Sequence, residues 1–351
     1  MKKNVYSIYR KALRLSRANY YFAFVLAKTW FNTVHKNRIY FDISEIQSNR
    51  YLANLIIYFH LANYTIYLPR NKKLIEELSF KNGEWRYMNL TLRCRLKFVS
   101  RRKIDLWNIR EIKLSNDYYR SDDGTSFRVP IGQYPFLYTH YNYPEVVPSE
   151  SRINSIFMSG NIDAKYYSKL DSSVHFSMPS RLKLFNYLRL QSSYFGLNTI
   201  NDWKCFIQNP KDKVVIVIDK STQFSLPFKE HKIGLCNFQY YLAMPGIEVP
   251  ESHNLIEAIK NGCIPIIHEE YSKLMNPPLI DGQNAIIYRE LSQLNNTIQN
   301  AFQIPKEDIS LLRKNVIAYY ENYLDPKVIV KRIVSEEFKM ILVQGEVYSL
   351  Q

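Results

Sequence analysis

The chain has 351 residues, and 47 Lys and Arg against 32 Asp and Glu give it a formal net charge of +15. An apolar content of 46% excludes a disordered chain, and the length predicts about two domains. The positive charge favours an anionic partner such as nucleic acid, acidic lipid or a phosphate-bearing substrate, without choosing among them. The cysteines lie far apart without metal-ligand spacing, so we expect free thiols in the reducing cytoplasm.

The first 36 residues are purely cationic, because the first acidic residue is Asp42. An apolar run at residues 20–31 is interrupted by Lys28 and is shorter than the roughly 20 residues of a spanning helix. We therefore expect neither a transmembrane segment nor a signal peptide. Residues 1–36 are interpreted as a basic amphipathic arm on an anionic membrane surface, or alternatively as a helix packed on the following domain.

A first alternation of strands and helices follows the arm. Residues 38–43 have the composition of a strand, 49–63 the apolar spacing of a helix, and 64–69 again that of a strand. Such a βαβ unit implies a parallel sheet with a right-handed crossover. Residues 93–148 begin with a basic run and continue as a loop-like stretch rich in Tyr and Pro.

A second alternation begins at a strand over residues 152–161. The elements expected after it are a helix at 180–190, strands at 213–219 and 238–246, a helix at 251–262 and the strand 263–267. This pattern predicts a second Rossmann-like domain at residues 149–325, after a first one at 37–148. Residues 326–351 are expected to return to the first domain, with a closing helix at 334–344.

The helix at 251–262 has polar residues where a ligand site is expected. Ser252 is a good N-cap and Gly262 a good terminator, and His253 and Asn254 occupy the first turn. The helix start follows a turn at the carboxyl end of a strand, where doubly wound sheets bind ligands. Its free N–H groups and dipole suit a diphosphate.

Glu257 lies one turn further along the same helix. Its carboxylate could accept hydrogen bonds from ribose hydroxyls next to a phosphate site. The alternative is that Ser252 only caps the helix and that Glu257 is a solvated face residue near Lys260.

The region around this helix resembles the donor-site segment of the exostosin family and its relatives among the GT-B glycosyltransferases. The shared pattern is an aromatic strand, a Pro-Gly turn, a Ser at the helix start, Glu-Ala, and then Gly-Cys-Ile-Pro. Here these residues are Tyr240, Pro245, Gly246, Ser252, Glu257, Ala258, Gly262, Cys263, Ile264 and Pro265. The resemblance implies an α/β fold that is GT-B-like, with two Rossmann-like domains facing each other across a cleft.

The resemblance also implies roles for single residues. Glu257 would hold the donor ribose, and the helix start at Ser252, His253 and Asn254, after the turn at Gly246, would face the diphosphate. Candidates from the early part of the second domain, chosen by location, are Arg181, Lys165 and Asn161. Many retaining GT-B enzymes carry a second Glu eight positions earlier, where this chain has Val249, so we expect inversion.

Inverting transfer needs a base for the acceptor hydroxyl. Asp42 and Glu45 follow the first strand and are the candidates, while capping of the strand end is the alternative for Asp42. His140 and Tyr138 are candidates for acceptor binding, or else part of a buried aromatic cluster. No Asp-X-Asp arrangement stands beside a strand, so we expect no metal and no cofactor other than the nucleotide-sugar substrate.

The sequence hypothesis is therefore a cytoplasmic glycosyltransferase, peripheral at the inner face of the membrane. It would transfer a sugar from a nucleotide sugar to a glycan or lipid-linked acceptor in the synthesis of bacterial surface polysaccharide or lipopolysaccharide. A nucleic-acid binder is one rival, supported by the charge and the basic run, but no nucleic-acid module is present and no such partner is expected. A catalytically inactive glycan-binding scaffold is the other rival.

Overall fold

The computed structural model describes residues 36–47, 50–70, 87, 90–120, 124–139, 147–167 and 175–350. The chain divides into two compact units. The first comprises Met1–Val129, Pro135–His140 and Pro326–Gln351, and the second comprises Pro130–Tyr134 and Tyr141–Asp325. All but the last residue of the predicted arm, and His140, lie outside the described residues.

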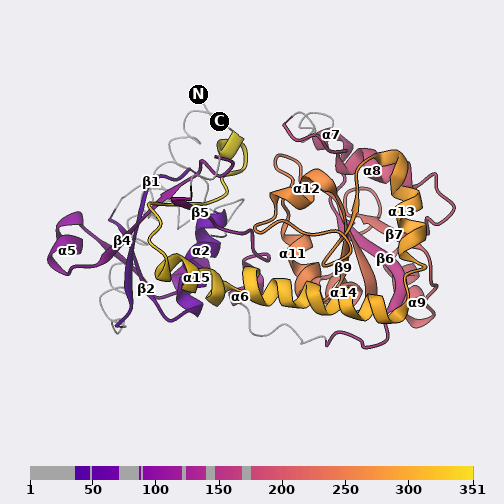
Figure 1. Ribbon diagram of the computed structural model, residues 1–351, viewed down its shortest axis with the longest axis horizontal. Coiled ribbons are helices and arrows are strands. Elements are labelled where there is room, and N and C mark those ends of the chain that lie inside the picture. The colour runs from indigo at the N-terminus through magenta and orange to yellow at the C-terminus, as the bar shows by residue number, and fades with distance from the viewer. Residues whose placement is uncertain are drawn as a thin grey trace, which may run out of the picture. The chain divides into compact units, whose positions relative to one another are not determined.

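The first unit is built on a six-stranded sheet of order β3-β2-β1-β4-β11-β5 (Figure 1). Its elements are β1 (Arg38–Glu45), α2 (Arg50–Leu61), β2 (Thr65–Pro69), η1 (Thr91–Arg93), β3 (Leu96–Val99), α5 (Arg101–Leu106), β4 (Arg110–Ser115), β5 (Ser126–Arg128), α6 (Phe136–Thr139), α15 (Pro326–Ser335), β11 (Met340–Leu342) and η5 (Glu346–Leu350). Every neighbouring pair of strands runs parallel. Four strands in the order 3-2-1-4 place a topological switch point between β1 and β4.

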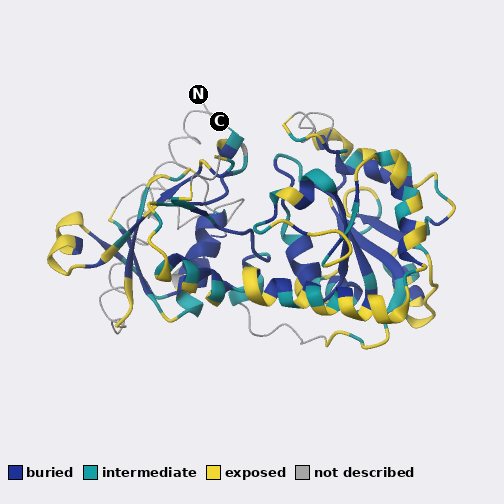
Figure 2. Cartoon of the chain, in the orientation of Figure 1, coloured by how far each residue is buried: buried dark blue, intermediate teal, exposed yellow. Residues whose placement is uncertain are grey.

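Helix α2 is apolar nearly all round, and its residues from Tyr51 to Phe59 are buried. It packs against β2 and against α15, so it is covered on more than one side. Figure 2 shows it in the colour of buried residues. This explains why its sequence is a nearly continuous apolar run rather than a one-sided stripe.

The second unit has a five-stranded sheet of order β10-β9-β8-β6-β7, also parallel throughout. Its elements are β6 (Ile153–Gly160), α7 (Ala164–Tyr167), α8 (Arg181–Leu188), α9 (Ile200–Gln208), β7 (Val215–Asp219), α10 (Phe228–Asn237), β8 (Phe238–Ala243), α11 (His253–Lys260), β9 (Ile264–His268), α12 (Glu269–Leu274), β10 (Ile286–Tyr288), η3 (Leu291–Gln293), α13 (Leu294–Ala301), α14 (Lys306–Tyr319) and η4 (Tyr320–Leu324). Strands β7 and β9 are buried at every position, as expected for parallel strands covered by helices.

The predicted α/β class with two Rossmann-like units is confirmed by these two parallel sheets. Pro265 is compatible with the central strand β9, because β10 pairs with β9 only from Ile266 onward, which leaves β8 as the neighbour of Pro265. One prediction was wrong, because residues 334–344 hold the end of α15 and strand β11 in place of a closing helix. The basic run at the start of the stretch 93–148 forms β3 and the start of α5, and β4 follows. The loop-like part after it holds the short elements β5 and α6 among its described residues.

Candidate functional site

The carboxyl edge of the second sheet has its switch point between β6 and β8. With β6 as its first strand, the sheet has the order 2-1-3-4-5, so the connections after β6 and β8 leave the sheet in opposite directions. Ligands of open α/β sheets bind at such points, outside the carboxyl ends of the strands. The residues that gather here come from β6, β8, α8 and α11.

Arg181 spans this switch point from the first turn of α8. Its Nη1 donates to the Asn161 carbonyl after β6 (2.9 Å). On the β8 side, its Nε donates to the Pro245 carbonyl (3.1 Å) and its Nη2 to the Met244 carbonyl (3.4 Å). The guanidinium also lies 5.6 Å from the ring centre of Tyr167.

The charge of Arg181 has no carboxylate partner among the described residues, although the side chain is only 7% exposed. Carbonyl dipoles satisfy three of its five N–H groups, which leaves two donors and the net charge. A buried cation without a counter-charge is costly, and an anionic ligand would remove that cost.

Gly160 and Asn254 make the close packing around Arg181 possible. A Cβ at Gly160 would lie 2.9 Å from Arg181 Nη1 and 3.6 Å from Asn254 Nδ2. Asn254 donates from Nδ2 to the Ser159 carbonyl (3.0 Å), which ties the first turn of α11 to the end of β6. The helix start and the guanidinium therefore meet at the same strand end.

Asp219 ends β7 beside these residues and organises the neighbouring loops. Its Oδ1 accepts from the amides of Ile162 and Ser221 (both 2.9 Å), and its Oδ2 accepts from the Thr222 hydroxyl (2.6 Å). Burial alone would raise the pKa of Asp219, but the hydrogen bonds outweigh it and lower the pKa below its usual value. Asp219 is thus a structural carboxylate.

Lys220 follows Asp219 and is exposed. Its amide donates to the Gly160 carbonyl (2.9 Å), which places it at the end of β6.

The turn before α11 depends on Gly246. Its amide donates to the Pro250 carbonyl (2.8 Å), and a Cβ at this position would lie 2.2 Å from the Val249 carbonyl oxygen. Ser252 is the N-cap residue, as predicted, but its side chain makes no capping hydrogen bond. Its amide donates to the Tyr271 hydroxyl (2.9 Å). Gly262 ends the helix with φ of +74°, as expected for a terminating glycine.

The segment Pro130–Tyr134 runs along α11. His253 donates from Nδ1 to the Gly132 carbonyl, and its ring lies edge-on to that of Tyr134 with the ring centres 6.0 Å apart. The Tyr134 amide donates to Glu257 Oε1 (3.2 Å). The two polar side chains expected to face a nucleotide are therefore in contact with a piece of the same unit.

Glu257 is buried, with 5% of its surface exposed, in contrast to the alternative of a solvated face residue. Burial raises the pKa of Glu257 to about 7, an effect only partly offset by the Tyr134 hydrogen bond and by the charges of Lys220 and Lys260. Its Oε2 lies 3.8 Å from His231 Nε2 on α10. Burial lowers the pKa of His231 to about 3, so at neutral pH the imidazole is uncharged and the two side chains do not form an ion pair.

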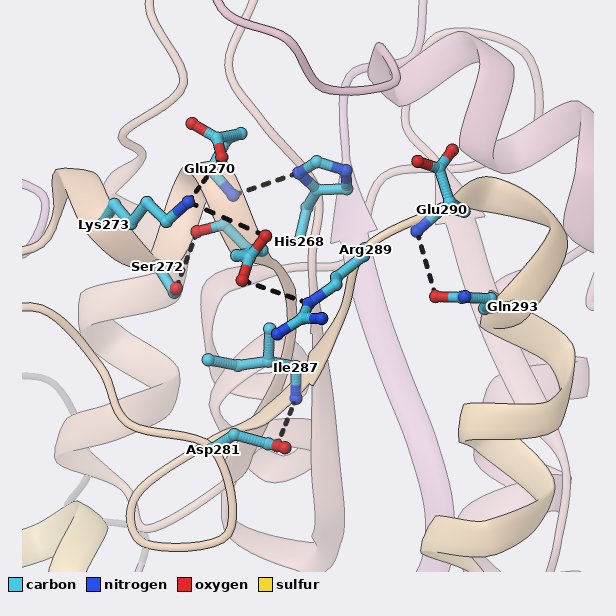
Figure 3. Close-up of polar contacts among 10 residues, drawn as sticks. His268, Glu270, Ser272, Lys273, Asp281, Ile287, Arg289, Glu290 and Gln293 are labelled. Carbon is cyan, nitrogen blue, oxygen red and sulfur yellow. Dashed lines mark hydrogen bonds and ion pairs between the residues drawn. The ribbon is translucent and has the colours of Figure 1, made fainter.

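At the other end of the same sheet edge, each of the two cations, Lys273 and Arg289, has a carboxylate partner. Figure 3 shows Lys273, which pairs with Glu270 (2.7 Å), and Arg289 after β10. Arg289 pairs with Glu269 (3.1 Å). His268 ends β9 and accepts the Glu270 amide at Nδ1 (3.2 Å). Lys273 and Arg289 therefore have carboxylate partners, unlike Arg181 at the switch point.

The remaining predicted site residues are spread more widely. Asp42 and Glu45 lie at the carboxyl end of β1, at the switch point of the first unit, where the pairing with β4 shifts register between them. Asp42 Oδ1 accepts the Ser44 amide (3.1 Å). Tyr138 lies in α6 and packs edge-on against Tyr58, with the ring centres 5.4 Å apart.

Two candidates from the early part of the second unit are exposed. Lys165 is on α7, where its amide donates to Asp163 Oδ1 (2.9 Å). The Asn161 side chain accepts the Asp163 amide (2.9 Å), so it is the Asn161 carbonyl rather than its carboxamide that reaches Arg181.

Neither a cluster of three potential metal ligands nor a membrane-crossing helix is present in the described part of the chain. No three His, Cys, Asp or Glu side chains among these residues converge on one point. None of the helices there combines the length and the apolar character needed to span a bilayer.

Comparison with known proteins finds weak similarity to solved structures. No protein-family model matches the sequence, and no curated protein matches it either. Among solved structures, a variant of the O-GlcNAc transferase of Thermobaculum terrenum is similar with a TM-score of 0.38 and 8% identity, over 87% of this chain and 68% of that one.

Two further solved structures are similar at the same level. A variant of TarM of S. aureus, in complex with fondaparinux, α-GlcNAc-glycerol and UDP, has a TM-score of 0.34 and 8% identity, over 80% of this chain and 57% of its own. CalG4, the calicheamicin glycosyltransferase, has a TM-score of 0.34 and 9% identity, over 85% of this chain and 97% of its own. The chain thus spans little more than half of TarM, and at these TM-scores the likenesses carry no argument about function.

Sequence reasoning missed several residues of this site. Lys220 follows directly after a recognised strand, and that position at a carboxyl strand end was the signal that could have found it. His231 and Tyr134 had no such signal, because each reaches Glu257 from a distant part of the chain.

Proposed function

We propose that this chain is a GT-B-type glycosyltransferase that takes its sugar from a nucleotide-sugar donor. The observation that carries the proposal is the buried guanidinium of Arg181, which has no carboxylate partner among the described residues and spans the β6/β8 switch point beside the start of α11. A diphosphate supplies the missing negative charge and also accepts from the helix amides. The resemblance of residues 238–271 to exostosin-type donor sites supports the same assignment.

In this proposal the phosphates lie against Arg181, Lys220 and the first turn of α11. Lys220 has an exposed surface, but its ammonium lies close enough to the protein for burial to lower the pKa of Lys220, whereas Arg181 is fixed by its carbonyl partners. Glu257 binds the ribose hydroxyls. Because the Tyr134 amide already donates to Glu257 Oε1, ribose binding competes with that contact.

The same groups supply the leaving-group chemistry. Breaking the glycosidic bond leaves charge on the departing diphosphate, and two cations with a helix terminus stabilise it without a metal. Asp42, with Glu45 as the second candidate, deprotonates the acceptor hydroxyl, and the reaction inverts the anomeric centre. Tyr138 and His140 contact the acceptor. This part of the proposal rests on the sequence and on the position of Asp42 at a strand end.

For the acceptor we propose a glycan or lipid-linked glycan of a bacterial surface polysaccharide or lipopolysaccharide. The protein would work in the cytoplasm, held at the anionic inner face of the membrane by the cationic residues 1–36. The support is the charge of that arm, in which no acidic residue occurs.

Thermal-shift measurements with nucleotides and nucleotide sugars test the donor site, because a ligand that binds only the native state raises Tm. We expect a nucleoside diphosphate to raise Tm of the wild type, and Lys220→Ala to weaken its binding about tenfold, by analogy with loss of one charge-assisted hydrogen bond. Lys204→Ala removes a similarly exposed lysine on α9 and should leave binding unchanged.

Arg181→Met should abolish the ligand-induced shift. The matched control is Arg152→Met, because Arg152 also donates to backbone carbonyls of Leu235 and Phe238, but near the start of β6. Absence of any shift with every nucleotide tested, or equal losses in both Arg variants, would contradict the donor site. Release of nucleotide from a nucleotide sugar by the wild type then separates an enzyme from a glycan-binding scaffold.

A further inference from the structure

The segment Ser100–Glu111 of the first unit has an outward surface that the proposed chemistry does not use. It holds α5 between β3 and β4, and Figures 1 and 2 show α5 standing out from the sheet with mostly exposed residues. Only Ile104 of this helix is buried, in a cluster with Tyr40, Tyr67, Val99 and Ile109. Ile104 therefore fixes which face of α5 points inward.

The outward residues form two pairs of a cation and an apolar side chain. Arg102 and Leu106 are four residues apart on one helix face, and Lys103 and Trp107 are four apart on the next. Leu106 is 72% exposed and Trp107 is 45% exposed. The Lys103 ammonium lies 5.6 Å from the Trp107 ring centre, so the cation and the ring stay together.

The acidic side chains of this segment lie on another side of the helix, where both contact Arg101. Arg101 pairs with Asp105 through Nε and Oδ1 (3.6 Å) and with both carboxylate oxygens of Glu111. By contrast, Arg102 and Lys103 have no acidic partner among the described residues. The outward surface is thus cationic and apolar at once.

We propose that Arg102, Lys103, Leu106 and Trp107 form a docking tip that inserts into an anionic lipid surface. Lys and Arg next to a bilayer are attracted by acidic headgroups, and a Trp with a polar neighbour is suited to the boundary between headgroups and acyl chains. The Trp107 ring packs edge-on against the buried Tyr67, with the ring centres 6.2 Å apart, but it stays half-exposed next to the exposed Leu106. A lipid surface would cover both apolar side chains, whereas a nucleic-acid surface would accept the cations but leave Leu106 without a partner. The tip belongs to another part of the sequence than residues 1–36, and it does not depend on the proposed sugar transfer.

Vesicle flotation with the full chain is the first test. We expect binding to vesicles that contain phosphatidylglycerol and little binding to pure phosphatidylcholine. Arg102→Gln with Lys103→Gln should lower the partition coefficient about 25-fold, because each cation contributes about fivefold. The charge-matched control Lys204→Gln with Lys229→Gln removes two exposed lysines of the second unit and should bind as the wild type does.

The apolar pair is tested in the same assay. Leu106→Ser with Trp107→Ser should lower partition at least about tenfold. The matched control Leu190→Ser with Leu311→Ser removes two exposed leucines of the second unit and should leave partition unchanged. A thermal melt checks that each variant is folded.

Fluorescence quenching distinguishes the tip from the cationic arm. In a background with Trp30→Phe and Trp85→Phe, the remaining tryptophans are Trp107 and the buried Trp203. Lipids brominated on their acyl chains should quench this protein on vesicle binding, and the quenching should disappear when Trp107 is also changed to Phe. Vesicle binding without quenching would assign attachment to the arm alone, and absence of binding or unchanged binding of the tip variants would likewise overturn the proposal.

Discussion

Replacing Glu257 by Gln should stabilise the second unit at alkaline pH. The glutamate has a pKa of about 7 in the folded chain against 4.5 for the free group, because burial disfavours its charged form. The contribution of Glu257 to the free energy of unfolding is therefore fully present below pH 4.5, and it is lost as the pH rises through about 7. A difference of 2.5 pH units corresponds to about 3 kcal/mol at 1.36 kcal/mol per unit. Gln retains an oxygen for the Tyr134 amide and has no charge to bury.

The expected result is a difference in unfolding free energy between the Glu257→Gln variant and the wild type that is near zero below pH 4.5 and grows to about 3 kcal/mol by pH 8. His231 acts in the opposite direction, because its pKa is lowered from 6.5 to about 3, so its stabilising effect is present above pH 6.5 and is lost as pH falls. Between pH 4.5 and pH 8 His231 is uncharged in the folded state, so its titration should contribute nearly equally to both proteins in that range.

Urea unfolding measures this difference in a background with Trp30→Phe, Trp85→Phe and Trp107→Phe, where the fluorescence is that of Trp203, which is fully buried in the second unit. Glu321→Gln, at an exposed position on η4, is the control and should stay within about 0.5 kcal/mol of wild type at every pH. A Glu257→Gln effect that is flat with pH, or that grows towards acid, would refute the reasoning. Glu257→Ala tests the ribose role, because it removes the acceptor oxygens and should weaken nucleotide binding, and unchanged affinity would remove Glu257 from the donor site.

Two further substitutions test the turn before α11 and the proposed base. Gly246→Ala should lower the free energy of unfolding by about 2 kcal/mol or more, because its Cβ would lie 2.2 Å from the Val249 carbonyl oxygen. Gly196→Ala is the control and should lower it little, because the atom nearest to its Cβ would be 3.4 Å away. Urea midpoints measure both effects. Asp42→Asn should abolish sugar transfer and preserve nucleotide binding, as measured by product formation and thermal shift, and a fully active variant would exclude Asp42 as the base.

Local sequence patterns were sufficient where an element is long and buried. The apolar runs that became α2, β7 and β9 were recognised because burial on several sides requires nearly continuous apolar sequence. Gly262 was recognised as a helix end for a local reason too, since its positive φ favours glycine.

Short elements and distant pairings were not recognisable in this way. Strands β5 and β11 have three residues each, and they pair with each other although Ser126 and Met340 lie in distant parts of the chain. Three residues are too few to show the alternating hydrophobic pattern of a strand, so their conformation depends on pairing with other strands. Helix α5 was missed because only Ile104 faces the core, which leaves a polar sequence with no apolar stripe.

The candidate site was only partly predictable for the same reason. Helix α11 and Glu257 were recognised from one continuous segment, but the environment of Glu257 was not. The carboxylate of Glu257 has polar contacts with Tyr134, 123 positions earlier in the chain, and with His231 on another helix. Burial of Glu257 is therefore a property of the tertiary structure, and it changes the expected carboxylate into a group that titrates near neutral pH.

The distribution of charge along one sheet edge gives the strongest indication of where a ligand binds. Beyond β9 and β10 the two cations, Lys273 and Arg289, each have a carboxylate partner in Glu270 or Glu269, and Asp281 and Glu290 accept backbone amides. At the switch point Asp219 accepts hydrogen bonds from amides and hydroxyls, and the raised pKa leaves Glu257 only partly ionised at neutral pH, so neither forms an ion pair with Arg181. Because both ends belong to one sheet and one fold, packing alone does not require this asymmetry. An anion bound between β6 and β8 accounts for it, since it would supply the charge that the surrounding residues withhold.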